Sequence, residues 1–283
     1  MTATKFDVWE DNRADKQYAA LVSACLVDGD RVRTRNSDVR RVTAHTLKFT
    51  STPLIGVRKT SWKLALREME WVLSGSNNIN DLHPSVHHWW KPWASASGEI
   101  YFNYGEQLRR FTAVDPRTGY LGQYDQVGEL VKNLRDHPNS RRLVMTTWNP
   151  AEMNHPDCPI TNCWGSIIQV FSYGDRYLEL VTYQRSVDVV CGLPHNLIQM
   201  WAFMKWLASR TGMGVGRLKW IGGDCHVYSD HYELAEKILD NTHNCKPTPT
   251  LCYNPTSEEF KADDFSLDIQ YEPVLTETAV MVV

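Results

Sequence analysis

The feature that most constrains this chain is a polar cluster where an expected strand meets an expected helix, in residues 183–196 (YQRSVDVVCGLPHN). Arg185, Ser186 and Asp188 end a strand-like run, and Asn196 stands where an apolar helical pattern begins. Binding residues are often carried by the irregular segments between regular elements. We therefore expect the fold to present this junction to a ligand.

The chemistry of these side chains indicates a nucleotide. Arg185 offers a planar fork of donors and Ser186 a hydroxyl, a combination suited to phosphate oxygens. Asn196 carries an acceptor beside two donors, which complements a ring that presents a carbonyl next to an N–H, as uracil does. The cluster favours a pyrimidine nucleotide.

Further segments surround this cluster in an order that resembles the thymidylate synthases and their pyrimidine hydroxymethylase relatives. They are RVRTRNS, REMEWVLSGSNNI, WWKPW, FNYG, NSRRLVMTTWNP, DCPITNCWG and GGDCHVYSDH. The resemblance covers most of the chain. It implies one catalytic domain over residues 1–283 with an α+β thymidylate synthase-like fold, in which a mixed sheet carries helices on one side and a dimer interface on the other.

Composition excludes several classes of function. The chain has 283 residues, 42% of them hydrophobic, and a net charge of −3, which permits a large core and gives little support to nucleic-acid binding. Its opening has no apolar signal region, and no long apolar run occurs, so we expect a cytoplasmic protein without a membrane span. Seven cysteines, an odd and scattered set, favour reduced thiols.

The resemblance assigns residues to the nucleotide. Arg33, with Arg185 and Ser186, is expected at the phosphate, while His226 and Tyr228 are expected at the ribose 3′-hydroxyl. A solvated charged face is the alternative for Arg33, because four other arginines crowd residues 31–41. His226 and His231 lack a third ligand, and Cys158 and Cys163 lack a matching pair, so no metal site is expected.

Two adjacent arginines point to an oligomer. Arg141 and Arg142 would face opposite sides of an extended strand, as expected if they reach outward to an anion. In the resembled family such a pair crosses a two-fold interface to the phosphate of the partner's site. A homodimer with shared sites is therefore implied.

The nucleophile has two candidates. Spacing to Gln169 and Arg185 favours Cys163, although one insertion is needed, and Cys158 stands before a proline as the family cysteine often stands after one. Arg185 would stabilise the attacking thiolate. A buried, inert cysteine is the ordinary alternative.

Three other residues are assigned to catalysis by the resemblance: Glu68 as a proton shuttle, Tyr104 as the group that removes the C5 proton, and Asn196 as the reader of the base. For a helical glutamate, a surface ion pair is the alternative. For Tyr104 the alternative is core packing.

The co-substrate is expected to be 5,10-methylenetetrahydrofolate. Trp90, Trp93, Asp188 and Gly192 are assigned to it by the resemblance, and the apolar C-terminus (277–283) is expected to close over it. The tryptophans would shield the reacting carbon, with core packing as their alternative.

Periodicity predicts the elements. Helices are expected at 15–27, 61–74, 124–136 and from Asn196 onward; strands are expected at 42–50, 141–149 and 265–273, with a hairpin at 166–183 and a charged loop at 28–42.

The product stays open between two fates of a methylene intermediate. Hydride transfer gives a methyl group and dihydrofolate; water gives a hydroxymethyl group and tetrahydrofolate. Trp164, His195 and Asp230 depart from the synthase pattern and favour hydroxymethylation of dUMP, with His195 and Asp230 or Glu68 ordering the water. Thymidylate synthesis is the alternative, and a nucleotide-binding or folate-binding homologue without catalysis is a third reading.

Overall fold

The computed structural model describes residues 14–152, 155, 158, 162–174 and 176–282. The opening segment on which the absence of a signal region was judged lies largely outside these residues. The helices are α1 Ala14–Val27, α2 Trp62–Ser74, α3 His87–Trp90, α4 Tyr104–Arg110, α5 Gln126–Asp136, α6 Leu193–Thr211 and α7 Tyr232–Asn241. The strands are β1 Asp30–Arg33, β2 Asp38–Phe49, β3 Phe111–Val114, β4 Leu121–Tyr124, β5 Val144–Met145, β6 Ile167–Tyr173, β7 Tyr177–Asp188, β8 Gly214–Tyr228, β9 Leu251–Tyr253 and β10 Phe265–Leu267.

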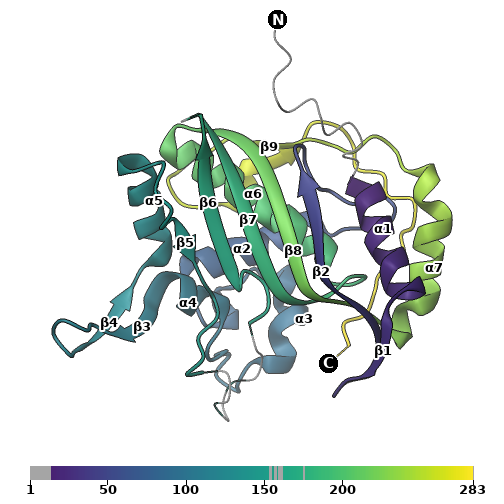
Figure 1. Cartoon of the computed structure of the whole chain (residues 1–283), viewed down its shortest axis with the longest axis horizontal. Helices are drawn as coiled ribbons and strands as arrows, with labels where there is room; N and C mark the ends of the chain where they lie inside the picture. Colours follow the sequence, from purple (N-terminus) through teal and green to yellow (C-terminus); the bar gives the residue numbers. More distant parts are fainter. Residues whose placement is uncertain (1–13, 153–154, 156–157, 159–161, 175, 283) are drawn as a thin grey trace, which may run out of the picture.

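A six-stranded mixed sheet organises the molecule. Its order is β1-β2-β8-β7-β6-β5, and β7 runs parallel to β8 while the other neighbours are antiparallel. The parallel pair is made possible by α6, which crosses back behind the sheet between the two strands (Figure 1). The expected α+β class with a mixed sheet is confirmed.

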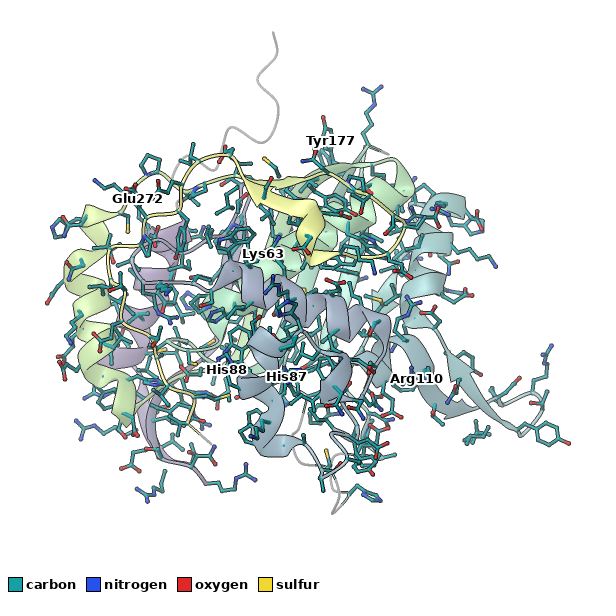
Figure 2. The ribbon with its side chains drawn as sticks, turned by 180° about the vertical axis from the view of Figure 1, so that it is seen from behind. Lys63, His87, His88, Arg110, Tyr177 and Glu272 are labelled. Atoms are coloured by element: carbon teal, nitrogen blue, oxygen red, sulfur yellow. The ribbon has the colours of Figure 1, made fainter. Side chains whose placement is uncertain are left out.

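Alternation along β7 decides which face is covered. Leu178, Leu180 and Thr182 are buried on the side of α6, whereas Tyr177 and Tyr183 stay exposed on the opposite face. Helix α6 is apolar on nearly all sides, so it can lie only in the interior, between the sheet and α2. Figure 2 shows this helical side, with Lys63 on α2 and His87 and His88 on α3.

The charged loop expected at 28–42 is wrong. Residues 30–33 and 38–49 form an antiparallel hairpin in which Asp30 opposes Arg41 and Arg33 opposes Asp38. These two pairs of opposite charge favour pairing of the strands, although Arg31 faces Arg40 between them. The strand expected at 42–50 is the second half of β2.

The strand expected at 141–149 is mostly wrong. Arg141 and Arg142 lie in a turn, and only Val144–Met145 joins the sheet. The chain then leaves the ladder because Thr146 Oγ1 donates to the Ser166 carbonyl and Thr147 Oγ1 to the Trp164 carbonyl. The argument that two extended arginines point to opposite faces therefore does not apply.

Other predicted elements differ in extent. The strand expected at 265–273 is three residues long and pairs with β9 outside the main sheet. The loop around the tryptophans contains α3 and a single turn of 3₁₀ helix, Lys91–Trp93. A second hairpin, β3–β4, projects from the body beyond Arg110 and had no strand prediction (Figures 1 and 2). Helices at 15–27, 61–74 and 124–136 and the hairpin at 166–183 are confirmed within one or two residues at most bounds.

In the described part of the chain, no helix is both long and apolar enough to cross a membrane.

Candidate functional site

The polar junction is a tight turn held by Asp188. Its Oδ1 accepts the backbone N–H of Val190 and of Cys191, each at 2.9 Å, and its carbonyl accepts the N–H of Gly192 at 3.0 Å. These three hydrogen bonds fix the backbone of the turn that leads into α6. The turn directs the end of β7 and the first turn of α6 toward the same space.

The cysteine segment is bound to the end of β7. The N–H of Arg185 donates to the carbonyl of Cys163 at 3.2 Å, and its Nε donates to the carbonyl of Asn162 at 3.5 Å. The guanidinium stands over the ring of Trp148 at 5.4 Å. The backbone of Arg185 therefore lies against the cysteine segment, and its stabilisation of a Cys163 thiolate stays a prediction.

Tyr104 is placed against Cys163 by the start of α4. The side chain of Asn103 accepts the N–H of Gly105 and so fixes the first turn of that helix. The Tyr104 hydroxyl then lies 3.6 Å from Cys163 Sγ and accepts the Cys163 N–H at 3.3 Å. Burial, followed by the neighbouring Cys163, raises the pKa of Tyr104 well above its ordinary value, so its proton is kept at neutral pH.

Cys163 stands immediately before a turn. Trp164 and Gly165 form this turn ahead of β6, and Gly165 adopts a φ of +61°, which glycine reaches without steric cost. The insertion expected between Cys163 and Gln169 stays a prediction. Cys158 instead hydrogen-bonds through its N–H to the carbonyl of His155, in the segment before the turn.

Glu68 faces inward while its neighbour Glu70 faces the loop after residue 258. Glu68 Oε1 accepts the indole N–H of Trp90 at 2.5 Å, and Oε2 accepts the amide of Gln199 at 2.6 Å. Removal from water raises the pKa of Glu68, which its two hydrogen bonds partly oppose. A carboxyl group that titrates closer to neutrality is suited to proton transfer.

Trp90 is fixed in an aromatic group next to the reactive pair. Its ring lies edge-on to Tyr104 at 6.0 Å and to Trp93 at 6.1 Å. Trp164 packs edge-on to the other side of Tyr104 at 5.5 Å. The cysteine, the tyrosine and three tryptophans therefore form one continuous cluster.

Asn196 is held by two glutamines that the sequence analysis did not single out. Gln184 Nε2 donates to Asn196 Oδ1 at 2.9 Å, and Asn196 Nδ2 donates to Gln199 Oε1 at 3.1 Å. Gln184 stands beside Arg185 in the YQRS segment, and Gln199 lies one helical turn beyond Asn196. Their spacing from Arg185 and Asn196 could have indicated both glutamines from the sequence.

The geometry brings a thiol, a phenol, a carboxyl group and an amide to one place. Comparison with known proteins identifies the family that carries these residues. The family model described as thymidylate synthase matches residues 16–283. The chain belongs to the thymidylate synthase family. A thymidylate synthase of Zymomonas mobilis subsp. mobilis (strain ATCC 31821 / ZM4 / CP4) is 30% identical over 294 residues, covering 92% of this chain and 96% of that protein. The protein is thus a folate-dependent transferase acting at C5 of a pyrimidine nucleotide.

The ribose candidates of this thymidylate synthase-family site lie on β8. His226 is opposite Asp188 in the sheet, and its Nδ1 lies 2.8 Å from Asp224 Oδ1, which is itself paired with Arg41 through Oδ2 at 3.0 Å. The hydrogen bond with His226, and to a smaller extent the pairing with Arg41, lower the pKa of Asp224. Tyr228 packs edge-on to His226 at 4.9 Å.

The residue expected at the phosphate, Arg33, ends β1 and borders the β1–β2 turn. It pairs with Asp38 at 3.0 Å on the exposed side of the hairpin. Asp230 accepts from Ser37 in the same turn at 3.1 Å, so it holds this loop and does not lie beside the reacting groups.

His195 proves to be a satisfied structural group. Its Nε2 accepts the N–H of Ser61 at 3.2 Å, and its Nδ1 lies 3.0 Å from the carbonyl of Cys191. Burial, and then the charge of Arg58, lower the pKa of His195 to about 4, so the neutral ring carries its proton on Nδ1. With both nitrogens engaged, His195 has no nitrogen left to order a water.

The C-terminal segment lies against the same junction. His231 Nε2 contacts the carbonyl of Val280 at 2.8 Å, and its Nδ1 lies 3.4 Å from Asp188 Oδ2. Cys191 Sγ contacts the carbonyl of Ala279 at 3.8 Å. The turn that contains two of the expected folate-side residues, Asp188 and Gly192, thus lies against the end of the described chain.

Three remaining observations concern other parts of the described chain. Arg141 and Arg142 lie in an exposed turn that precedes β5. Among the described residues, no group of three or more His, Cys, Asp or Glu side chains could hold a metal ion. A cleft of about 720 Å³ opens elsewhere, on the outer side of α2 between Arg67, Trp71 and Arg210, and contains none of the expected catalytic residues.

Proposed function

We propose that this protein is a thymidylate synthase, which converts dUMP and 5,10-methylenetetrahydrofolate to dTMP and dihydrofolate. The observation that carries this proposal is the hydrogen bond from Trp90 to Glu68, which fixes an indole ring beside Tyr104 and Cys163. A rigid aromatic wall at this place excludes water from the reacting carbon and favours transfer of hydride.

The proposed roles follow from the contacts. Cys163 forms the bond from Sγ to C6 of the pyrimidine, and Asn196 supports the negative charge that this addition sends to O4. C5 then bonds to the methylene carbon of the folate and loses its proton toward Tyr104, whose hydroxyl lies 3.6 Å from Sγ. The bond from the methylene to folate nitrogen breaks, hydride from tetrahydrofolate reduces the exocyclic methylene to methyl, and the thiolate leaves C6.

The motifs taken alone favour hydroxymethylation, and that product remains the second candidate because Trp164, His195 and Asp230 depart from the synthase pattern. The groups expected to order the attacking water are nevertheless engaged elsewhere. His195 uses both ring nitrogens, Asp230 belongs to the β1–β2 turn, and both Glu68 oxygens accept hydrogen bonds from the protein. This arrangement supports the methyl product.

A single catalytic domain acting as a homodimer is part of the proposal. The uncovered face of the sheet carries Val144, Ile167, Tyr173, Tyr177 and Tyr183, each at least 38% exposed. An apolar, aromatic face of this kind is suited to burial against a second copy. Arg141 and Arg142 stand at the edge of that face, where they would reach the phosphate of the partner's nucleotide, while Arg33, Arg185 and Ser186 would approach from the same chain.

Product analysis tests the proposal. Incubation with dUMP and methylenetetrahydrofolate should give a dTMP peak and the rising absorbance of dihydrofolate. Formation of 5-hydroxymethyl-dUMP without dihydrofolate would establish a hydroxymethylase instead. Mass spectrometry with 5-fluoro-dUMP and methylenetetrahydrofolate addresses the third reading, since the absence of any adduct on a cysteine would indicate a binding protein.

A further inference from the structure

A continuous line of hydrogen bonds runs from β8 through the base-reading amide to α2. Trp220 Nε1 donates to Gln184 Oε1 at 2.9 Å, and Gln184 Nε2 donates to Asn196 Oδ1 at 2.9 Å. Asn196 Nδ2 donates to Gln199 Oε1 at 3.1 Å. Gln199 Nε2 ends the line by donating to Glu68 Oε2 at 2.6 Å and to the Ala65 carbonyl at 3.0 Å.

The two ends of this line are chemically unambiguous. An amide oxygen and nitrogen have similar shapes, so the orientation of a glutamine or asparagine follows from its partners. At one end the indole of Trp220 is only a donor, which requires the oxygen of Gln184 to face it. At the other end the Ala65 carbonyl is only an acceptor, which requires the nitrogen of Gln199 to face it.

Both ends impose the same orientation on Asn196. Because Trp220 engages the oxygen of Gln184, the nitrogen of Gln184 faces Asn196 and requires the Asn196 oxygen there. Because Ala65 engages the nitrogen of Gln199, the oxygen of Gln199 faces Asn196 and requires the Asn196 nitrogen there. Rotation of the Asn196 amide by half a turn would place two NH₂ groups together at Gln184 and two carbonyl oxygens together at Gln199. Rotating both glutamines as well would remove these two clashes, but it would turn the wrong atoms toward Trp220 and the Ala65 carbonyl.

Burial makes these conflicts unavoidable. Trp220 is fully buried, and Gln184 and Gln199 are 2% and 3% exposed, so water does not reach these groups to replace a lost partner. Trp220 is itself confined, because a Cβ on Gly222 would lie 2.3 Å from its ring. The orientation of Asn196 is therefore set by the core and not by the ligand.

We propose that Trp220 and Gln199, acting through Gln184, are positioning residues that make Asn196 accept a uracil ring and reject a cytosine ring. In this orientation Asn196 keeps one N–H and one oxygen lone pair for a base. Uracil presents an acceptor at O4 beside a donor at N3, whereas cytosine presents the reverse pair and would need the rotated amide. This inference rests on the proposed dUMP reaction only for the identity of the preferred base.

Freeing both ends tests the inference. We expect Trp220→Phe or Gln199→Met alone to lower the preference for dUMP over dCMP by a few fold, because the other end still opposes rotation, as does the Ser186 carbonyl, which accepts from Gln184 Nε2 at 3.3 Å. The double variant should lower it by more than the product of the two single effects, roughly tenfold or more beyond it, since coupled residues are not additive. The preference is measured both as the ratio of kcat/KM values and as the ratio of Kd values for the two nucleotides.

Trp206→Phe is the matched control. Trp206 is also buried, and its indole N–H donates to the Glu258 carbonyl at 3.1 Å, remote from the Asn196 line. This variant should lose stability to a similar extent and keep the wild-type preference. An unchanged preference in a folded double variant would overturn the inference while leaving the dUMP reaction in place. A wild type that forms no product from dUMP, with the Kd ratio still shifting in the double variant, would overturn the proposed function and uphold the inference.

Discussion

The hydroxyl of Tyr104 accepts the backbone N–H of Cys163 and lies 3.6 Å from the sulfur of the same residue. The N–H takes one acceptor position of the hydroxyl oxygen, and the phenol proton is directed to the sulfur or to a ligand. The phenol thus both fixes the cysteine backbone and occupies the nearest proton-transfer position. This double contact connects α4 with the cysteine segment, which are far apart in the sequence.

Replacement of Tyr104 by Phe should separate these two tasks from substrate binding. We expect kcat to fall by about 10² to 10⁴, the range for loss of a proton-transfer group. Binding of dUMP should change little, because the proposed nucleotide contacts lie on Arg185, Ser186 and Asn196. Single-turnover kinetics and the dUMP Kd provide the measurement, and a large loss of dUMP affinity would assign Tyr104 to ligand binding.

The two cysteine candidates can be distinguished directly. Cys163→Ser should abolish turnover and the 5-fluoro-dUMP adduct while retaining nucleotide binding, because serine is a far weaker nucleophile at neutral pH. Cys158→Ser is the matched control and should keep most of the activity. The reverse result would show that the nucleophile is Cys158.

Sharing of sites across a dimer predicts complementation. A protein with Arg141→Ala and Arg142→Ala and a second protein with Cys163→Ser should each be inactive alone. After subunit exchange, hybrid dimers should regain activity, because one of their two sites combines an intact cysteine with intact arginines. No recovery despite exchange confirmed by native mass spectrometry would indicate that each site is complete within one chain.

Ala44 is strained in β2. Its φ of +56° lies in the left-handed region, where a Cβ costs about 1 to 2 kcal/mol. Ala44→Gly should raise the free energy of unfolding by about 0.5 to 1 kcal/mol after the added flexibility of the unfolded chain is subtracted. Ala113→Gly in β3, where φ is negative, should have the opposite sign in denaturant titrations. A destabilised Ala44→Gly protein would contradict the strain.

Glu152 should give a measurable pH dependence of stability. Burial, and then the charge of Glu106, raise its pKa to about 7. The folded state therefore holds a proton that the unfolded state has released, so stability is greatest below the ordinary glutamate pKa and declines as pH rises toward 7. The side chain is partly exposed, so we expect a decline of about 1 kcal/mol after allowance for solvent screening.

Glu152→Gln provides the control for that decline. The variant should show a flatter dependence of the unfolding free energy between pH 5 and pH 8, by roughly the same 1 kcal/mol. Parallel curves for the wild type and the variant would mean that Glu152 does not carry the proton.

Much of the fold and site follows from local sequence signals. The spacing of Trp62, Leu66, Met69 and Leu73 determined α2, and alternation on both sides of Gly174 determined the β6–β7 hairpin. The YQRS and GLPHN segments specified Arg185, Ser186 and Asn196, because each residue type there has one evident chemistry. Their grouping around the turn of Asp188 needed no long-range information.

Tertiary structure decided the features that depend on partners distant in sequence. The many charged residues in 28–42 predicted a loop where the structure has the β1–β2 hairpin. The strands of this hairpin are stabilised by each other and by β8, which is distant in sequence. The pairing of Arg33 with Asp38 likewise depends on the hairpin, which places the two residues opposite each other.

The orientation of Asn196 shows the same division most clearly. The sequence by itself determined that an amide stands at the start of α6, where it can read a base. Only the fold determined which way that amide faces, because Trp220 on β8 and Ala65 on α2 impose it from opposite ends of a buried line of hydrogen bonds. Hydrogen-bond direction is a property of packed neighbours, and no local pattern encodes neighbours that arrive from other elements.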